Sequence, residues 1–138
     1  MDATNTDQST FAGHGGKLIV LEHMADYAQS PYAGIRYFQT VQSKMGTGRV
    51  DDFMRLYTAP GVDHVGSGAP ANVDMLSVLA DWVERGRAPG DLEVVAQERV
   101  PPFSVTTSRP LCRWPAYPHH KGGTLIRAAS FECRAGKP

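Results

Sequence analysis

The stretch that decides the fold reads Gly15-Gly16-Lys17-Leu18-Ile19-Val20-Leu21. In it a glycine pair leads into four consecutive apolar residues. A short continuous apolar run bounded by turn-forming residues is typical of a strand buried on both faces, as in a parallel sheet. We therefore predict a parallel strand at 18–21, and a loop at 22–27 that leads from its carboxyl end towards a helix.

Strand and helix signals alternate beyond this run. Ser30 can cap a helix and Pro31 fits its first turn, so a helix is predicted at 31–45. A second apolar segment predicts a strand at 53–58, and apolar residues at helical spacing predict a helix at 72–85. Alternating strands and helices favour an α/β architecture built on a parallel sheet.

The two ends of the chain differ from this middle part. Residues 1–10 lack apolar periodicity and are predicted to form a flexible arm, which leaves 11–138 as the folded portion. After residue 90 a short strand is expected at 92–96, and the rest, rich in proline and glycine, is predicted to be irregular. Cys112 and Cys133 both lie in this tail, and a bridge between them would close a loop of about 20 residues.

Length and charge exclude several classes of protein. The 138 residues suit one domain. Lys plus Arg and Asp plus Glu are 14 each, so the charge excess expected of a nucleic-acid or anionic-membrane binder is absent. No apolar run approaches the roughly 20 residues that cross a bilayer, and the polar first ten residues are unlike a signal peptide. Two cysteines do not fix the redox compartment.

Asp26 and His64 are the candidate catalytic residues. Each follows a predicted parallel strand, and ligands of open α/β sheets gather at that edge. An aspartate that orients a histidine base is one half of a Ser-His-Asp triad. In α/β-hydrolases the order along the chain is nucleophile, acid, histidine, so the nucleophile is expected upstream of Met1. The alternative is that His64 is a solvated residue of a glycine-rich loop.

Other polar residues have simpler interpretations. Ser67 lies near His64 but not in the strained strand-to-helix turn that exposes a nucleophile. His119-His120 has no carboxylate or cysteine at metal-ligand spacing, so surface exposure is favoured and no metal or cofactor is predicted. His14 and His23 are expected to be solvated loop residues. Glu22 and Asp26 suggest an acid pair, but solvation or capping of the next helix is the stronger expectation.

A series of motifs resembles one enzyme family, the tannases and feruloyl esterases of the α/β-hydrolase superfamily. The motifs run in order and with compatible spacings from about Phe11 to Cys133. They are Gly15-Gly16-Lys17-Leu18-Ile19-Val20, Ala25-Asp26, Ser30-Pro31, Pro60-Gly61-Val62-Asp63-His64, Asp81-Trp82-Val83-Glu84, Arg109-Pro110-Leu111-Cys112, Tyr117, Lys121-Gly122 and Ala129-Ser130-Phe131-Glu132-Cys133.

This resemblance implies roles for the matching residues. Asp26 would be the triad acid, His64 the general base, and Cys112 and Cys133 a structural disulfide. The family hydrolyses esters of aromatic acids through an acyl-serine intermediate, and its members are usually exported. The cysteine that usually follows the family's histidine is Val65 here, which removes a second disulfide.

The nucleophile itself is not found in this sequence. No Gly-x-Ser-x-Gly elbow surrounds any of its serines, which are Ser9, Ser30, Ser43, Ser67, Ser77, Ser104, Ser108 and Ser130. Three hypotheses follow: the C-terminal part of a serine esterase, a non-catalytic binding or assembly module, or one subunit of a split esterase. Aromatic esters would be substrates only where an upstream part is supplied. A parallel strand without its upstream neighbours also predicts a homodimer that covers the incomplete sheet.

Overall fold

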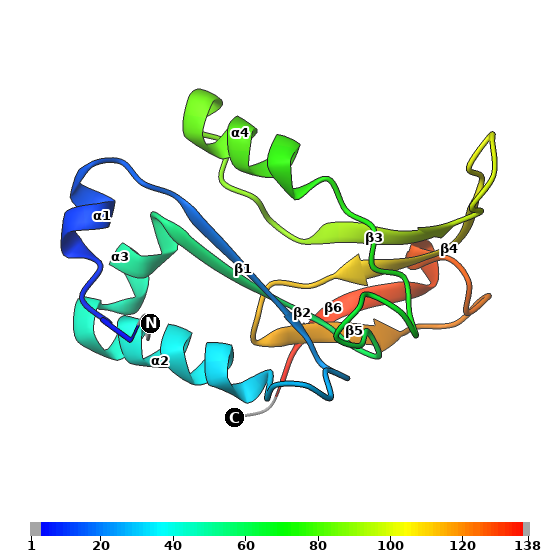
Figure 1. Cartoon of the computed structure of the whole chain (residues 1–138), viewed down its shortest axis with the longest axis horizontal. Helices are drawn as coiled ribbons and strands as arrows, with labels where there is room; N and C mark the ends of the chain where they lie inside the picture. Colours follow the sequence, from blue (N-terminus) through cyan, green and yellow to red (C-terminus); the bar gives the residue numbers. More distant parts are fainter. Residues whose placement is uncertain (1–3, 137–138) are drawn as a thin grey trace.

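The apolar run at 18–21 forms most of strand β1 (Leu18–His23), which pairs in parallel with β2 (Met54–Ala59). The register places Leu18 opposite Met54 and His23 opposite Ala59, so both strands end at the same edge. The computed structural model describes residues 4–136, and Figure 1 shows this strand pair beside a group of antiparallel hairpins. The predicted parallel pairing is confirmed, although β1 runs two residues beyond the predicted 18–21 and β2 is shifted by one residue from the predicted 53–58.

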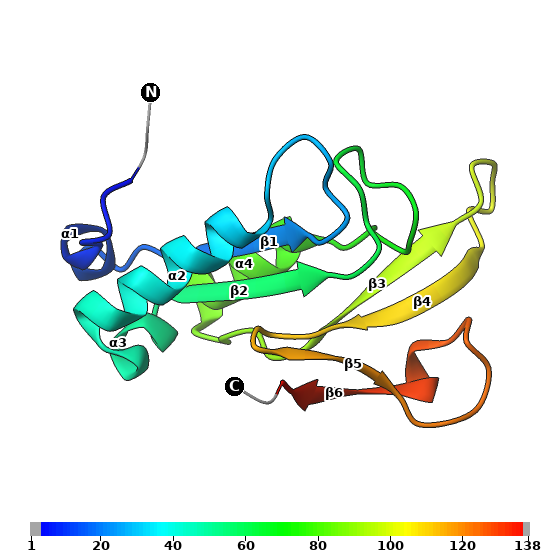
Figure 2. The same cartoon turned by 90° about the horizontal axis from the view of Figure 1, so that it is seen from below.

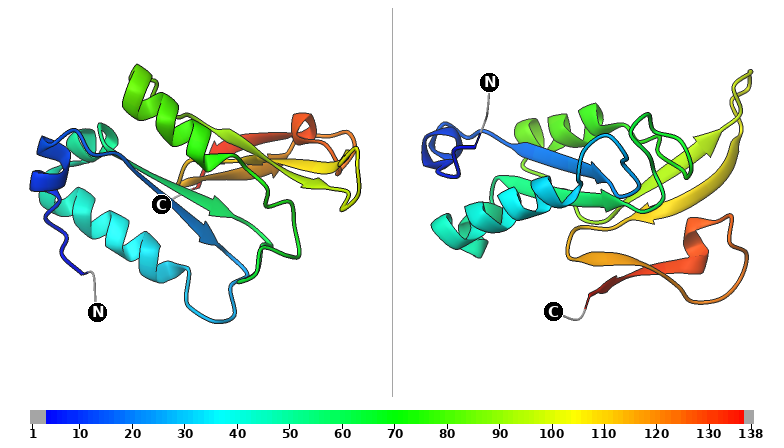
Figure 3. Two further views of the ribbon diagram at one scale, coloured as in Figure 1. Left: turned by 45° about the horizontal axis from the view of Figure 1, so that its top comes forward. Right: turned by 60° about the horizontal axis from the view of Figure 1, so that its bottom comes forward.

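Two helices lie on opposite sides of the β1–β2 pair (Figure 3). Helix α2 (Tyr32–Met45) buries Ile35, Phe38 and Val41 against one face of the pair. Helix α4 (Met75–Arg85) buries Trp82, whose ring lies 4.8 Å from the guanidinium of Arg55. These helices confirm the strand–helix alternation.

The helix starts differ in detail from the prediction. Ser30 makes no side-chain cap to α2, whose N-cap is Pro31. Helix α4 begins at Met75 instead of residue 72, because Asp74 is its N-cap and accepts a hydrogen bond from the Ser77 N–H at 3.0 Å. Two short helices, α1 (Ser9–Gly13) and α3 (Thr47–Asp51), were not predicted.

The predicted flexible arm at 1–10 is not wholly irregular, because part of its described segment, residues 4–10, forms helix and makes specific hydrogen bonds. Ser9 and Thr10 belong to α1, and the Gln8 side-chain amide donates to the Tyr37 hydroxyl at 2.7 Å. The Tyr37 hydroxyl in turn donates to the Asn5 carbonyl at 2.8 Å. Residues 1–3 lie outside the described residues. The segment before β1 is therefore fastened to α2 by specific hydrogen bonds.

The prediction of an irregular tail is wrong. Strand β3 (Leu92–Gln97) pairs antiparallel with β4 (Val105–Leu111), and β5 (Ala116–His120) pairs antiparallel with β6 (Phe131–Ala135), which follows the 3₁₀ turn η1 (Ala128–Ser130) (Figure 2). Pro110 lies inside β4 and Pro118 inside β5. Proline in a segment usually argues against strand structure, because it has no N–H to donate. Each of these two lies in a strand that pairs with one other strand only, so the position of the missing N–H can face away from that partner.

The tail also covers the second edge of β2. The Trp114 N–H donates to the Leu56 carbonyl at 2.8 Å, and Arg113 forms an isolated bridge to Tyr57. All six residues of β2 are consequently buried, whereas those of β1 are half-buried. Among the described residues no helix is long and apolar enough to cross a bilayer.

The predicted disulfide is present between Cys112, which is buried just after β4, and Cys133 of β6. Their Cα atoms are 5.6 Å apart, and the two cysteines are separated by 21 positions in the sequence. The bridge joins the β3–β4 hairpin to the β5–β6 hairpin.

The disulfide is expected to contribute substantially to stability. Replacing both cysteines with alanine should lower the free energy of unfolding by roughly 3 kcal/mol, because the unfolded chain regains the entropy of the open loop. Urea denaturation followed by circular dichroism measures the change. An unaltered denaturation midpoint would show that the hairpins hold together without the bridge.

Candidate active site

The acid loop, residues 24–30, fixes Asp26 directly after β1. The Asp26 N–H donates to the His23 carbonyl at 3.1 Å, so the chain turns as the strand ends. The Oδ1 atom of Asp26 accepts from the N–H groups of Ala28 at 2.7 Å and Gln29 at 3.1 Å. These local bonds, common for aspartate in turns, hold one carboxylate oxygen and leave Oδ2 free to point elsewhere.

The histidine loop, residues 60–70, is braced by a second aspartate. The Oδ1 atom of Asp63 accepts from the N–H groups of Val65 at 3.0 Å and Ser67 at 2.7 Å, and the Asp63 N–H donates to the Ser67 carbonyl at 2.9 Å. Gly68 has a φ of 93°, and a side chain there would overlap the Gly61 carbonyl. These contacts fix the backbone of the loop on both sides of His64.

Three hydrogen bonds join the end of β1 and the acid loop to the end of β2 and the histidine loop. The Met24 N–H donates to the Ala59 carbonyl at 3.1 Å, and the Ala25 N–H donates to the Val62 carbonyl at 2.9 Å. The third joins His23 Nδ1 to the Asp63 carbonyl at 2.8 Å, with Nδ1 as the protonated nitrogen. The expectation that His23 is a solvated loop residue is therefore wrong. Its partner is a backbone carbonyl, so no residue type in the sequence indicates this bond.

Asp26 and His64 meet where the two loops come together. His64 Nδ1 lies 3.0 Å from Asp26 Oδ2, as expected for two residues that follow neighbouring parallel strands. The Asp26 side chain is only 10% exposed, and that of His64 is 45% exposed. The carboxylate holds the imidazole through Nδ1, which leaves Nε2 outside this hydrogen bond.

The hydrogen bond from His64 is the main reason that the pKa of Asp26 lies below its ordinary value of 3.8. Partial burial acts in the opposite direction, and the Ala28 and Gln29 N–H groups add to the lowering. The Tyr27 ring lies beside the pair, with its centroid 6.0 Å from that of His64. Asp26 is thus held in the charged form that a histidine base requires.

Glu22 does not form an acid pair with Asp26. Its carboxyl lies against Gly34 in the first turn of α2, where any added side chain would overlap it. Burial, and secondly the nearby charge of Asp26, raises the pKa of Glu22. The expectation of solvation or of capping the next helix is not met by Glu22 either, because the residue is half-buried and α2 receives no side-chain cap.

The remaining polar candidates lie apart from this site. Within residues 4–136 no hydrogen bond joins the Ser67 hydroxyl to His64. His120 contacts the Gly123 carbonyl at 3.2 Å, and His119 is half-buried instead of exposed, with Arg134 at 3.4 Å. A cluster of Asp91 with Cys112 and Cys133 has metal-like spacing, but both its sulfurs are bonded to each other.

Comparison with known proteins identifies relatives along nearly the whole chain. A family model described as tannase and feruloyl esterase matches residues 1–134. The chain is 40% identical over 134 residues to a probable feruloyl esterase of Arthroderma benhamiae, covering 94% of this chain and 25% of that protein. It is 36% identical over 138 residues to a mono(2-hydroxyethyl) terephthalate hydrolase of Piscinibacter sakaiensis, covering 96% and 22%.

A solved structure shows the same arrangement of elements. The crystal structure of feruloyl esterase B from Aspergillus oryzae matches with a TM-score of 0.79 and 25% identity, over 95% of this chain and 29% of that one. The chain spans about a quarter of the length of the curated relatives that it matches. The similarity is thus to one part of an α/β-hydrolase-type esterase.

The Asp26–His64 bond makes a testable electrostatic prediction. His64→Ala should raise the pKa of Asp26 towards its ordinary value, because the largest cause of the lowering is removed. Because the folded-state pKa is depressed, the bond stabilises the fold above about pH 4, and that stabilisation is lost as pH falls through the folded pKa. Carbon-13 NMR of the Asp26 carboxyl during an acid titration measures the change.

A matched control removes a distant histidine. His14→Gln changes an exposed residue near α1 and should leave the Asp26 titration as it is in the wild type. The same Asp26 pKa in the wild type and in His64→Ala would contradict the pairing.

Proposed function

This chain belongs to the tannase and feruloyl esterase family, and we propose that residues 11–138 form the C-terminal portion of a carboxylic-ester hydrolase domain, with Asp26 as triad acid and His64 as general base. The single observation that supports this most is the 3.0 Å bond between His64 Nδ1 and Asp26 Oδ2. Because Nδ1 of His64 makes this bond, Nε2 remains available. The acid also precedes the histidine along the chain, as in α/β-hydrolases.

The proposed reaction needs a serine from outside these 138 residues. His64 Nε2 removes the proton of that serine hydroxyl while its oxygen attacks the ester carbonyl. The tetrahedral intermediate expels the alcohol, which takes the proton from His64, and an acyl-serine remains. Water, activated by the same nitrogen, then releases the acid and restores the serine. Asp26 stabilises the imidazolium that forms in both steps.

Esters of aromatic acids are the proposed substrates. Two relatives are named for the feruloyl and terephthalate groups, both of which are aromatic acyl groups. The residues that would bind an acyl group next to the serine are expected outside this chain, so this proposal concerns the substrate class only.

The triad proposal is tested by exchange of the matching segment. Residues 1–134 replace the corresponding quarter of the Arthroderma benhamiae relative, and hydrolysis of methyl ferulate is measured. The chimera should be active, and Asp26→Asn or His64→Ala should lower kcat by about 10⁴-fold, because the base loses its orientation or is removed. His14→Gln is the control and should retain activity.

The 138 residues alone give the complementary result. They should not hydrolyse a nitrophenyl ester above background or react with a fluorophosphonate, since no serine is activated. A chimera that keeps its activity in His64→Ala, or a burst of nitrophenol from the chain alone, would sink the assignment.

We further propose that the 138-residue chain forms a homodimer when prepared alone. Within the described residues β1 pairs only with β2, so its other edge offers unpaired backbone groups to a second strand. Helix α4 also leaves Leu76 78% and Val83 57% exposed, and apolar surface of this kind favours association. A two-fold pair is the simplest closed arrangement.

Light scattering at micromolar concentration measures the association state. The wild type should be dimeric, and the double variant Leu76→Lys, Val83→Lys should shift towards monomer, because two lysines oppose burial of this helix face. Glu84→Lys, an exposed change on the same helix, is the control for altered charge. A stable monomeric wild type would refute self-association.

A further inference from the structure

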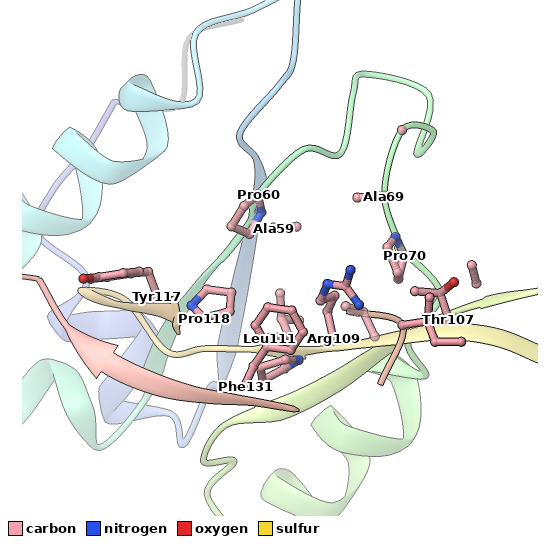
Figure 4. Close-up of a pocket in the computed structure, with 15 residues that line it drawn as sticks. Ala59, Pro60, Ala69, Pro70, Thr107, Arg109, Leu111, Tyr117, Pro118 and Phe131 are labelled. Carbon is pink, nitrogen blue, oxygen red and sulfur yellow. The ribbon is translucent and has the colours of Figure 1, made fainter. Parts of the chain in front are cut away.

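A cavity of about 760 Å³ lies between the histidine loop and the C-terminal hairpins, and the proposed reaction does not use it (Figure 4). Its floor is one face of the β3–β4 pair, where Val94 lies opposite Arg109 and Ala96 opposite Thr107. The histidine loop forms one wall. The opposite wall comes from β5, β6 and the segment between them, through Tyr117, Pro118, Ile126 and Phe131.

Arg109 is the only charged side chain among the residues that line this cavity. Its guanidinium carbon lies 4.6 Å from the centre of the Phe131 ring, and Nη1 donates to the Ser108 carbonyl at 2.8 Å. In Figure 4 the guanidinium points up from the floor between Pro60 and Pro70. Stacking on Phe131 thus fixes the direction of a cation that faces the empty space.

Within residues 4–136 no carboxylate forms an ion pair with Arg109. The ion pairs found among residues 4–136 involve Arg55, Arg85, Arg87, Arg113, Arg134 and His64, each with an aspartate or glutamate. Arg109 is only half-buried, and most of its N–H donors have no partner within the described part of the chain. A guanidinium in this state can donate two N–H hydrogen bonds to the two oxygens of a planar carboxylate.

The remaining walls determine what the carboxylate must be attached to. Proline, alanine and larger apolar or aromatic side chains dominate the lining, and the volume lies in the range of small-molecule sites. Flat apolar walls on both sides of a single oriented cation suit a ring with one carboxylate. We propose that this cavity binds a small aromatic carboxylate, paired to Arg109 through its carboxylate and packed against Phe131 and Ile126 through its ring.

Cinnamate is the probe, titrated into the 138-residue chain and followed by ¹H–¹⁵N NMR. Changes in amide chemical shift should concentrate on strands β4, β5 and β6 and on the histidine loop. Cinnamamide, which has the same ring without the charge, should bind roughly tenfold more weakly or worse, because a hydrogen bond to a charged group is lost. Inorganic phosphate, an anion without a ring, should likewise bind more weakly than cinnamate.

Variants assign the effect to Arg109. Arg109→Met keeps an unbranched stem against Phe131 and should abolish the preference for cinnamate over cinnamamide. Arg134→Gln changes an exposed arginine of β6 that is paired with Glu132, and should bind cinnamate as the wild type does. Equal binding of cinnamate and cinnamamide by the wild type overturns the proposal without any variant, as do shifts confined to the surface of α4.

Discussion

The parallel register of β1 with β2 is the constraint on which the rest of the structure depends. Because His23 lies opposite Ala59, the two strands end together and their loops leave the sheet side by side. Backbone bonds from Met24 and Ala25 continue the ladder into those loops, and a side-chain bond from His23 extends it by one further step. A slip of one residue would reverse the face of every β1 side chain and move the acid loop away from the histidine loop.

Strand β2 is enclosed, and β1 packs against a different cluster on each of its faces. Alternate residues of β1 pack on opposite sides: Leu18 and Val20 join the α2 cluster, whereas Ile19 and Leu21 join the cluster that includes Tyr57 and Leu111. The second cluster draws on β3 and β4, and the disulfide joins β4 to β6. The β3–β4 hairpin therefore contributes to the core around the parallel strands. It provides one of the two faces that a parallel strand must bury.

Sequence patterns predicted the parallel strands, the alternation with helices and the approach of Asp26 to His64, because all three follow from local apolar periodicity and from one rule about strand ends. The hairpins of the tail escaped prediction because Pro110 and Pro118 removed the usual signal, and only pairing in space shows that their edges are free. The role of His23 escaped for another reason. Its partner is the Asp63 carbonyl, and a backbone acceptor leaves no mark in the sequence.

The two carboxyl groups near the end of β1 show how position within this frame separates their chemistry. Glu22 faces α2, and burial against Gly34 raises its pKa, so its charged form is disfavoured there. Asp26, four residues later, is beyond the strand, where hydrogen bonds from His64 and two backbone N–H groups lower its pKa. Opposite shifts in neighbouring acids are a way to assign separate roles. Only Asp26 has its charged form stabilised by the imidazole, and a reversal of the two environments would leave His64 without an orienting anion.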